Sequence, residues 1–363
     1  MADETAFSPD YTASRSRFRA AALAAGWDWT AHGLGCNGPD GDPLTVDVAR
    51  IGPERPTHVV VVSSGLHGIE GFFGAAVQVG LLEGALADWR PPEGVAVLML
   101  HALNPYGFAH LRRVNENNVD LNRNFLLDGE RYAGSPARYR DLDPLLNPTS
   151  PPGGVELFLL RAGWAIARHG MPALKDAVAG GQYDFPLGVF YGGDSPQATV
   201  ALLRDQLPGW LGPAARRVLH VDFHTGLGAP ATYKLLVDHA AGSPGHAALA
   251  RAFGDAVQPW QNTGVSYAIR GGMGTWCKAR FPRIDYDVLA AEFGTVSILR
   301  VIQGLRAENR AHHHARPDDP ARHAAKLALR EIFAPSDATW RRTAVARGAA
   351  IVQTALAVAA TRA

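Results

Sequence analysis

With 363 residues, the chain is long enough for one large α/β domain or two smaller ones, and its composition of 47% hydrophobic and 19% charged residues is typical of a globular protein. Its formal net charge of +1 argues against a surface built for nucleic acid or an anionic membrane. Two cysteines exclude a disulfide framework and a multi-thiolate zinc site. Since the chain lacks an apolar leader and any uninterrupted run of ~18 apolar residues, we expect a cytoplasmic protein without a transmembrane helix.

The first part of the chain alternates helical and strand patterns. Residues 9–26 carry aromatic and alanine residues at helical spacing and end at a glycine. Residues 44–52 alternate apolar and polar side chains, which predicts a half-exposed strand. The β-branched run at 57–65 predicts a strand covered on both faces, and a helix follows over 71–87. Residues 95–105 repeat the buried-strand pattern and end at Asn-Pro.

The second part is less regular at first. The stretch from about 126 to 215 is rich in Pro and Gly, and we predict that it is an insertion into the domain. Buried-strand patterns resume at 218–228 and 284–295, and an Ala-rich helical tail covers about 320–363. Because there is no internal repeat and no linker between separate cores, we predict one domain over 1–363. Its fold class is α/β, a central mixed sheet flanked by helices.

Polar side chains of metal-binding type stand where three of these apolar strands end. His67 and Glu70 follow the first strand, Asp222 and His224 lie in the second, and Glu292 lies in the third. A His-x-x-Glu spacing lets a tight turn aim both side chains at one ion. Two histidines and a carboxylate are a known ligand set of catalytic zinc. Taken alone, however, so short a pattern is more often two hydrogen-bonded histidines and a solvated glutamate.

A second block, RRVNENNVDLNRNF at 112–125, crowds Asn, Asp and Arg residues without helical or strand periodicity. Its polar side chains Arg112, Arg113, Asn122 and Arg123 could clamp an anionic substrate beside a metal ion. The alternative is a solvated basic loop, and the block alone favours neither interpretation.

Together these blocks resemble the zinc carboxypeptidases, the carboxypeptidase A-like superfamily. HGIE matches the first ligand motif of that family, and RVNENNVDLNRNF matches its Arg and Asn-Arg pattern. DFHT matches the third ligand, AAEFGT matches the strand of the catalytic glutamate, and SYAIRGGMGTW resembles the tyrosine loop. Similar His-x-x-Glu, D-L-N-R and late Glu elements recur in the related aspartoacylase and succinylglutamate desuccinylase branch, whose members hydrolyse N-acyl amino acids.

The resemblance implies a metal site. His67, Glu70 and His224 would bind Zn²⁺, one ion per chain. Asp120 would accept a hydrogen bond from a zinc-binding histidine and fix its tautomer. Asp222 shares a strand face with His224 by alternation, which fits a similar contact or a simple capping role.

The resemblance also implies a hydrolase that cleaves an amide bond next to a free carboxylate, with zinc-activated water. Glu292 would be the general base and acid, and Arg113 would stabilise the oxyanion. Asn122 and Arg123 would hold the terminal carboxylate of the substrate, and Tyr267 would close over it.

Two positions limit what can be said about the substrate. Arg270 stands where the tyrosine loop usually has a small residue, and it either adds an anion contact or extends into solvent. Gly274 occupies the position that sets side-chain preference, and a glycine specifies neither charge nor shape. We expect a peptide or small-molecule substrate with a free carboxylate, and no nucleic-acid or membrane partner. The sequence carries no signal for the oligomeric state.

Three functions stay open from the sequence. They are a metallocarboxypeptidase, an N-acyl-amino-acid deacylase, and a non-catalytic zinc-binding module. The Arg-to-Asn spacing favours the peptidase, while the missing signal peptide favours small cytosolic amides. The presence of all three ligands with Glu292 and Arg113 argues against a silent module. The three histidines at 312–314 are predicted to be solvated, because adjacent side chains on a helix do not converge on one ion.

Overall fold

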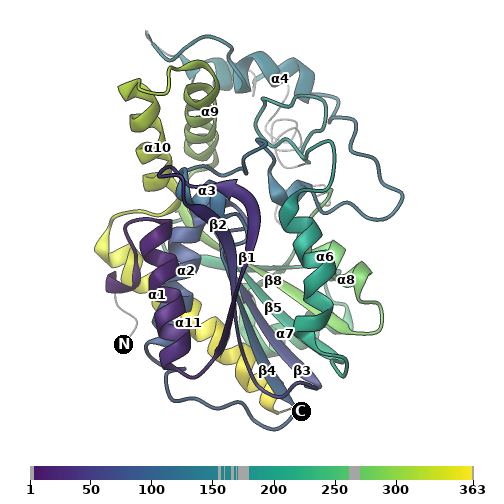
Figure 1. Cartoon of the computed structure of the whole chain (residues 1–363). Coiled ribbons are helices and arrows are strands. Elements are labelled where there is room, and N and C mark those ends of the chain that lie inside the picture. Colours follow the sequence, from purple (N-terminus) through teal and green to yellow (C-terminus); the bar gives the residue numbers. More distant parts are fainter. Residues whose placement is uncertain are drawn as a thin grey trace.

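The computed structural model describes residues 4–153, 157–158, 160–164, 167–168, 170, 180–260 and 270–361. An eight-stranded mixed sheet runs through the middle of the molecule in the order β1-β2-β4-β3-β5-β8-β6-β7 (Figure 1). Its strands are β1 (Asp28–Asn37), β2 (Pro43–Ile51), β3 (His58–Ser63), β4 (Val95–His101), β5 (Arg217–Leu227), β6 (Tyr233–Val237), β7 (Val257–Pro259) and β8 (Asp285–Val296).

The centre of the sheet is parallel. β4, β3, β5 and β8 pair in parallel, whereas β2 joins β4 and β6 joins β8 in antiparallel pairs. The carboxyl ends of β3, β5 and β8 therefore meet at one edge, the usual place for a site in an α/β sheet. The fold class predicted from the sequence, a mixed sheet flanked by helices, is confirmed.

Among the described residues, helices cover both faces of this sheet and also lie above one of its edges. They are α1 (Tyr11–Ala24), α2 (Gly71–Leu82), α3 (Pro105–Ala109), α4 (Tyr139–Leu146), α6 (Ala198–Leu211), α7 (Pro244–Phe253), α8 (Met273–Arg280), α9 (Ile298–His314), α10 (Pro320–Phe333) and α11 (Ala338–Ala360). Short 3₁₀ turns add η1 (Glu4–Ala6), η2 (Gly68–Glu70), η3 (Leu121–Arg123) and η4 (Gly254–Ala256).

Two hydrophobic cores hold the layers together. On one face, α1, α2 and α11 pack over side chains such as Phe73, Phe223 and Phe293 (Figure 1). On the other face, α6 and α8 pack over a second core that contains Leu203 and Trp276. The stretch predicted as an insertion thus ends in a helix, α6, that forms part of this second core. A third cluster joins α4, α9 and α10 above the sheet edge.

Burial corrects one strand prediction. β2 is not half-exposed as its alternating pattern suggested, because Val46, Asp47, Val48 and Ala49 are all buried. The polar Asp47 faces Arg15 of α1, whose Nε lies 3.0 Å from a carboxylate oxygen. An alternating strand can therefore be covered on both faces when its polar face is paired with a helix. The edge strand β1, with four polar residues and two glycines among its ten, was not predicted from the sequence.

The helical tail predicted at the C-terminus is built into the core. Within the described residues, α11 is the one helix that is long and apolar enough to cross a membrane by length and composition. In the structure it packs against α2, β3 and β5, and Val345, Ile351 and Val352 are buried. Asp337 caps its start by accepting a hydrogen bond from the backbone of Trp340 at 2.6 Å.

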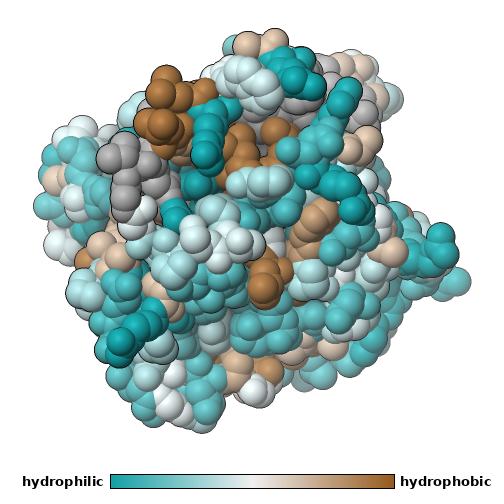
Figure 2. Space-filling model, turned by 90° about the horizontal axis from the view of Figure 1, so that it is seen from above, coloured by the Kyte–Doolittle hydropathy of each residue, from teal (hydrophilic) through white to brown (hydrophobic). Residues whose placement is uncertain are grey.

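The surface above the sheet edge is mixed in polarity. Seen from above, Figure 2 shows a largely hydrophilic surface interrupted by separate hydrophobic patches. Among the described residues, large exposed apolar side chains include Leu160, Trp164 and Leu187. Single exposed apolar side chains are common on soluble proteins, and we assign no role to these.

Candidate metal centre

The first two candidate ligands stand on a tight turn after β3. His67 precedes η2, and Glu70 is its last residue. The backbone N–H groups of Gly68 and Ile69 donate to the carbonyl groups of Arg113 and Arg112 at 3.0 and 2.8 Å. A Cβ atom on Gly68 would lie 2.2 Å from the backbone of Gly107, so only glycine fits there. The turn that carries both ligands is therefore fixed by backbone contacts.

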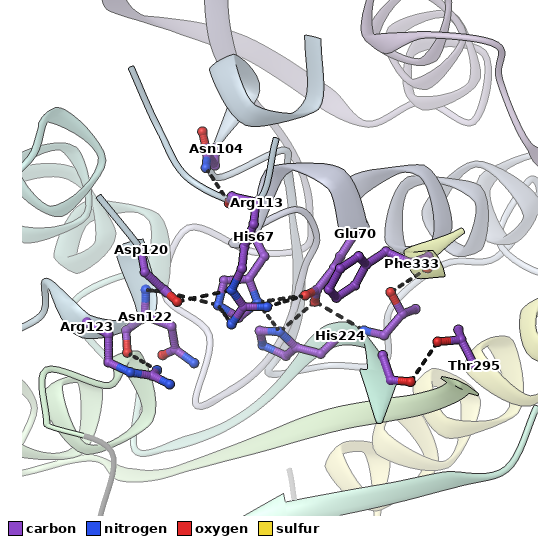
Figure 3. A network of polar contacts seen from close by, with 12 residues as sticks. His67, Glu70, Asn104, Arg113, Asp120, Asn122, Arg123, His224, Thr295 and Phe333 are labelled. Atoms are coloured by element: carbon purple, nitrogen blue, oxygen red, sulfur yellow. Dashed lines mark hydrogen bonds and ion pairs between the residues drawn. The ribbon is translucent and has the colours of Figure 1, made fainter. Parts of the chain in front are cut away.

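His67, Glu70 and His224 converge on one point and are all buried (Figure 3). Nδ1 of His67 lies 2.9 Å from Oε1 of Glu70 and 3.3 Å from Nδ1 of His224. Nδ1 of His224 lies 3.1 Å from Oε2 of Glu70. Nitrogen ligands held 2.0–2.1 Å from one tetrahedral zinc ion are about 3.3 Å apart. The donor atoms of these three residues thus fit a single zinc ion.

Each histidine has a carboxylate on its other ring nitrogen. Nε2 of His67 lies 3.1 Å from Oδ1 of Asp120, and Nε2 of His224 lies 2.6 Å from Oδ2 of Asp222. A ring that donates from Nε2 keeps its Nδ1 lone pair free for a metal ion. Both carboxylates that the sequence analysis singled out therefore lie where they can orient a ligand. For Asp222 the structure decides in favour of the histidine contact over a capping role.

Arg113 enters the same cluster. It donates from Nη1 to Oε1 of Glu70 at 2.9 Å and from Nε to Oδ2 of Asp120 at 3.1 Å. Its Nη2 also lies 2.7 Å from Nε2 of His67, so it competes with Asp120 for that nitrogen. Although burial opposes it, the positive charges of His67 and Arg113 hold the pKa of Glu70 below its ordinary value. Arg113 and His67 likewise hold the pKa of Asp120 well below its usual range.

The cluster as a whole carries excess negative charge. Its carboxylates are Glu70, Asp120, Asp222 and Glu292, and its permanent cations are Arg113 and Arg123. If both histidines are neutral, as metal ligands are, four carboxylates and two guanidinium groups leave a formal charge of −2, which a divalent cation would neutralise. Asp222 and Glu70 raise the pKa of His224 well above its ordinary value in spite of its burial. Burial and the charge of Glu70 raise the pKa of Glu292.

Glu292 reaches the site from the neighbouring strand. It lies directly opposite His224 in the parallel pairing of β5 and β8, so both side chains point to the same face of the sheet. The residue is partly buried, so it remains partly exposed to solvent. A carboxylate with a raised pKa beside candidate metal ligands has the properties of a general base or acid.

Asn122 and Arg123 lie next to a pocket beside the histidines. Arg123 is buried and donates from Nη1 to the carbonyl of Asn122 at 2.8 Å, and its Nε has no hydrogen-bond partner among the described residues. The pocket is lined by Asn122, Asp222, His224, Leu236, Asp238, Trp260, Gly272, Met273, Gly274, Thr275, Val288 and Ala290. A Cβ atom on Gly274 would meet Val288 at 3.5 Å, an ordinary contact, so a side chain could enter the pocket there.

Two predicted substrate contacts lie elsewhere. Arg112 is fully buried and donates to Glu308 at 2.9 Å and to Asn118 at 3.0 Å, so it cannot meet a substrate. Arg270 donates to the carbonyl of Ala133 at 2.9 Å and lies over the ring of Tyr183, so it braces a loop instead of adding an anion contact. The predicted role of Tyr267 falls outside the described residues.

The histidines at 312–314 are not the solvated surface that the sequence suggested. All three are partly buried, and Nε2 of His313 lies 3.1 Å from Oδ1 of Asn118. His312 and His313 lie near Arg112 and Glu308 because α9 lies against the 112–118 loop. Sequence reasoning also missed Ser63, which donates to Asp222, and His220, which contacts Ser63 in turn. His220, Asp222 and His224 alternate along β5, and this pattern was the available signal for His220.

The fold and the site together define an α/β protein with a buried His–Glu–His group that can hold a metal ion. The chain belongs to the family described as protein of unknown function DUF2817, whose model matches residues 7–347. No curated protein matches the sequence.

Solved structures with a similar arrangement include bovine thrombin-activatable fibrinolysis inhibitor, determined with a tick carboxypeptidase inhibitor. It is 12% identical, has a TM-score of 0.44 and covers 94% of this chain and 98% of its own. Carboxypeptidase A from Helicoverpa armigera is 14% identical with a TM-score of 0.41, covering 94% of this chain and 73% of its own. A murein-tripeptide amidase from Escherichia coli O157 is 15% identical with a TM-score of 0.35, covering 88% and 97%. At these TM-scores we draw no functional argument from the likeness.

Proposed function

We propose that the protein is a zinc-dependent hydrolase that cleaves an amide bond next to a free carboxylate, as a metallocarboxypeptidase does. The observation that carries this proposal is the convergence of His67, Glu70 and His224 beside two arginines at the carboxyl edge of the sheet. The ligand atoms of the three residues lie within 4.8 Å of one another.

The ligand set fits zinc in both chemistry and charge. Two imidazole nitrogens and a carboxylate leave further coordination positions open, which is the composition of catalytic zinc sites. When bound, a zinc ion would acidify a water molecule and polarise a carbonyl group. Asp120 and Asp222 orient the histidine rings for this task.

The remaining residues supply the other parts of an amide hydrolysis. Glu292 would take a proton from the attacking water and pass it to the leaving amine, and its raised pKa suits both transfers. Arg113 would place a fixed positive charge beside the developing oxyanion, where one donor is typically worth ~10²–10³ in rate. The Nε of Arg123, to which none of the described residues hydrogen-bonds, would bind the substrate carboxylate together with Asn122.

The pocket beside Arg123 supports a substrate whose leaving residue has an apolar side chain. Leu236, Met273, Val288 and Ala290 are among its lining residues, and Asp238, which also lines it, is exposed. An N-acyl-amino-acid deacylase is the second candidate, since the same carboxylate and side-chain pockets would hold the amino acid of such a substrate. We propose a peptide or small amide as substrate, with the protein acting in the cytoplasm and without a nucleic-acid or membrane partner.

The test joins metal content to turnover. We expect about one zinc per chain in the wild type and in Glu292→Gln, measured by elemental analysis, and loss of the metal in His67→Ala. With dipeptides and N-acetyl amino acids as substrates, Glu292→Gln should lose ~10²–10⁴ in kcat. Glu93→Gln, at an exposed position before β4, is the matched control and should act as the wild type does. Full turnover in Glu292→Gln, or no zinc in the wild type, would refute the proposal.

A further inference from the structure

A chain of buried polar side chains runs away from His224 beneath α8. Oδ1 of Asp222 lies 2.5 Å from Oγ of Ser63, and that Oγ lies 2.7 Å from Nε2 of His220. Nδ1 of His220 lies 3.1 Å from the hydroxyl of Tyr286. All of these residues are at most 2% exposed. The sequence around them, HVDFH, places His220 and His224 on one strand face four residues apart.

The direction of each hydrogen bond follows from Asp222, because a carboxylate accepts hydrogen bonds and cannot donate one. Because Asp222 is a carboxylate, Ser63 must donate its hydroxyl hydrogen to it. The oxygen of Ser63 then accepts from Nε2–H of His220, which leaves Nδ1 of His220 to accept from Tyr286. Every hydrogen in the chain therefore points toward Asp222, whose second oxygen accepts from His224 at 2.6 Å.

His220 takes part as a neutral ring. Burial lowers the pKa of His220 to about 4, against the charge of Asp222, which raises it. Both of its ring nitrogens are engaged by hydroxyl groups, so it is not a further metal ligand although its spacing to His224 suggests one. A neutral His220 with its hydrogen on Nε2 fixes the direction of the hydrogen bonds on both sides of it. It adds no charge to this series of hydrogen bonds.

We propose that Ser63, His220 and Tyr286 are positioning residues that hold Asp222 so that His224 presents Nδ1 to the metal. The inference rests on the proposed metal site and goes beyond it by assigning three side chains that bind neither metal nor substrate. The proposed role also explains why these buried positions between β3, β5 and α8 hold polar side chains. Apolar side chains could fill the same space. Buried polar groups cost free energy unless all are paired, and in this chain each of the named atoms is paired.

The register of the sheet supports this role. Ser63 lies directly opposite Asp222 in the parallel pairing of β3 and β5, so the two side chains share a face. Ser63 is also the last residue of β3, four positions before His67. The end of β3 thus leads into the turn that carries His67, and through Ser63 and Asp222 it also supports the orientation of His224.

The experiment measures metal affinity separately from stability. Zinc affinity would be determined by competition with a chelator for the wild type, Ser63→Ala and Tyr286→Phe, together with the absorption spectrum of the Co²⁺ forms. We expect Ser63→Ala to bind zinc about 10–100-fold more weakly and to change the Co²⁺ spectrum. Tyr286→Phe removes the far end of the chain and should have the same effect to a smaller degree.

Ser14, elsewhere in the protein, provides a matched control. It also forms a buried serine–histidine pair, with Oγ 2.9 Å from Nε2 of His101, but this pair joins α1 to β4 and does not include Asp222. Ser14→Ala should lower stability by a similar amount and leave zinc affinity and the Co²⁺ spectrum unchanged. This comparison separates a positioning role from the general cost of breaking a buried serine–histidine bond.

The outcomes distinguish this inference from the proposed function. If the wild type binds one zinc and Ser63→Ala binds it equally well with an unchanged spectrum, the positioning role is wrong and the metal site stands. If the wild type binds no zinc, both are wrong. If Ser63→Ala does not fold, Tyr286→Phe decides, because an unchanged affinity and spectrum there would overturn the inference.

Discussion

A buried ion cluster behind the metal centre allows one prediction to be worked through in detail. Glu308 on α9 accepts hydrogen bonds from Arg112 at 2.9 Å and from Lys326 on α10 at 2.9 Å. The backbone carbonyl of Arg112 in turn accepts from Ile69 in the turn between His67 and Glu70. The cluster therefore ties two helices to the segment that supports the candidate ligands. We predict that Glu308→Gln destabilises the protein and that the loss depends on pH.

The magnitude follows from the pKa of Glu308. Burial alone would raise it, but Arg112 and Lys326 lower it to about 2, from an ordinary value of 4.5. A pKa that is lower in the folded state stabilises the fold above pH 4.5, and this contribution is lost as the pH falls from 4.5 toward 2. At 1.36 kcal/mol for each unit, the ionised carboxylate contributes about 3 kcal/mol at pH 7, of which roughly 2 kcal/mol is gone at pH 3.

The variant should lose more than this at neutral pH, because it leaves the buried Arg112 and the partly buried Lys326 without a carboxylate. Removing one partner of a buried pair typically costs about 3–5 kcal/mol. Urea denaturation of the wild type and Glu308→Gln from pH 7 to pH 3 measures the gap between their free energies of unfolding. We expect the gap to shrink by roughly 2 kcal/mol over that range. Asp205→Asn, which changes an exposed carboxylate on α6 next to Arg204, is the control with no such trend. A gap that stays constant with pH would refute this reasoning.

Two further variants test a contact to a candidate ligand and the packing of the backbone beside the pocket. Asp120→Asn keeps the shape of the side chain but removes the carboxylate that faces Nε2 of His67. We therefore expect zinc affinity to fall about 10–100-fold in a chelator competition, while the far-ultraviolet circular dichroism spectrum is unchanged. Unchanged zinc affinity would contradict the orienting role of Asp120. Gly271→Ala places a Cβ atom 2.2 Å from the carbonyl oxygen of Arg123 at a φ of +69°, and should cost clearly more stability than Gly242→Ala, which has a φ of +73° and no neighbour within 4 Å. The control should cost about 1–2 kcal/mol from backbone conformation alone, and equal losses in urea denaturation would exclude a steric effect at Gly271.

The sequence predicted the centre of the fold and the candidate ligands because both depend on local patterns. The β-branched run of β3 predicts a strand buried on both faces, and its four valines are at most 1% exposed. His67 and Glu70 follow it at a spacing that a single turn can bring together. Parallel strands end at one edge, so a histidine on a later strand of the same type, His224, was expected nearby.

The distinction between Arg112 and Arg113 could not be made from the sequence. The two residues are adjacent in an irregular segment, where no periodicity says which side chain faces inward. Arg112 is directed by Glu308, which lies 196 positions away on α9, whereas Arg113 is directed by Glu70 and Asp120. Such a choice depends on tertiary contacts with partners that the local pattern does not contain. The same reason applies to the histidines at 312–314, which were expected in solvent and lie against the 112–118 loop.

The position of the candidate base depends on sheet register more than on any single contact. His224 and Glu292 lie opposite one another in β5 and β8, and a slip of one residue would turn either side chain to the other face of the sheet. The register is held by the neighbours of these residues in sequence. Phe223 and Phe293 point to the opposite face, are fully buried, and pack against Phe73 of α2 with ring centroids 5.6 and 4.6 Å apart. The phenylalanines in DFHT and AAEFGT thus fix which face receives the polar residues, and α2 links that core to the turn that carries Glu70.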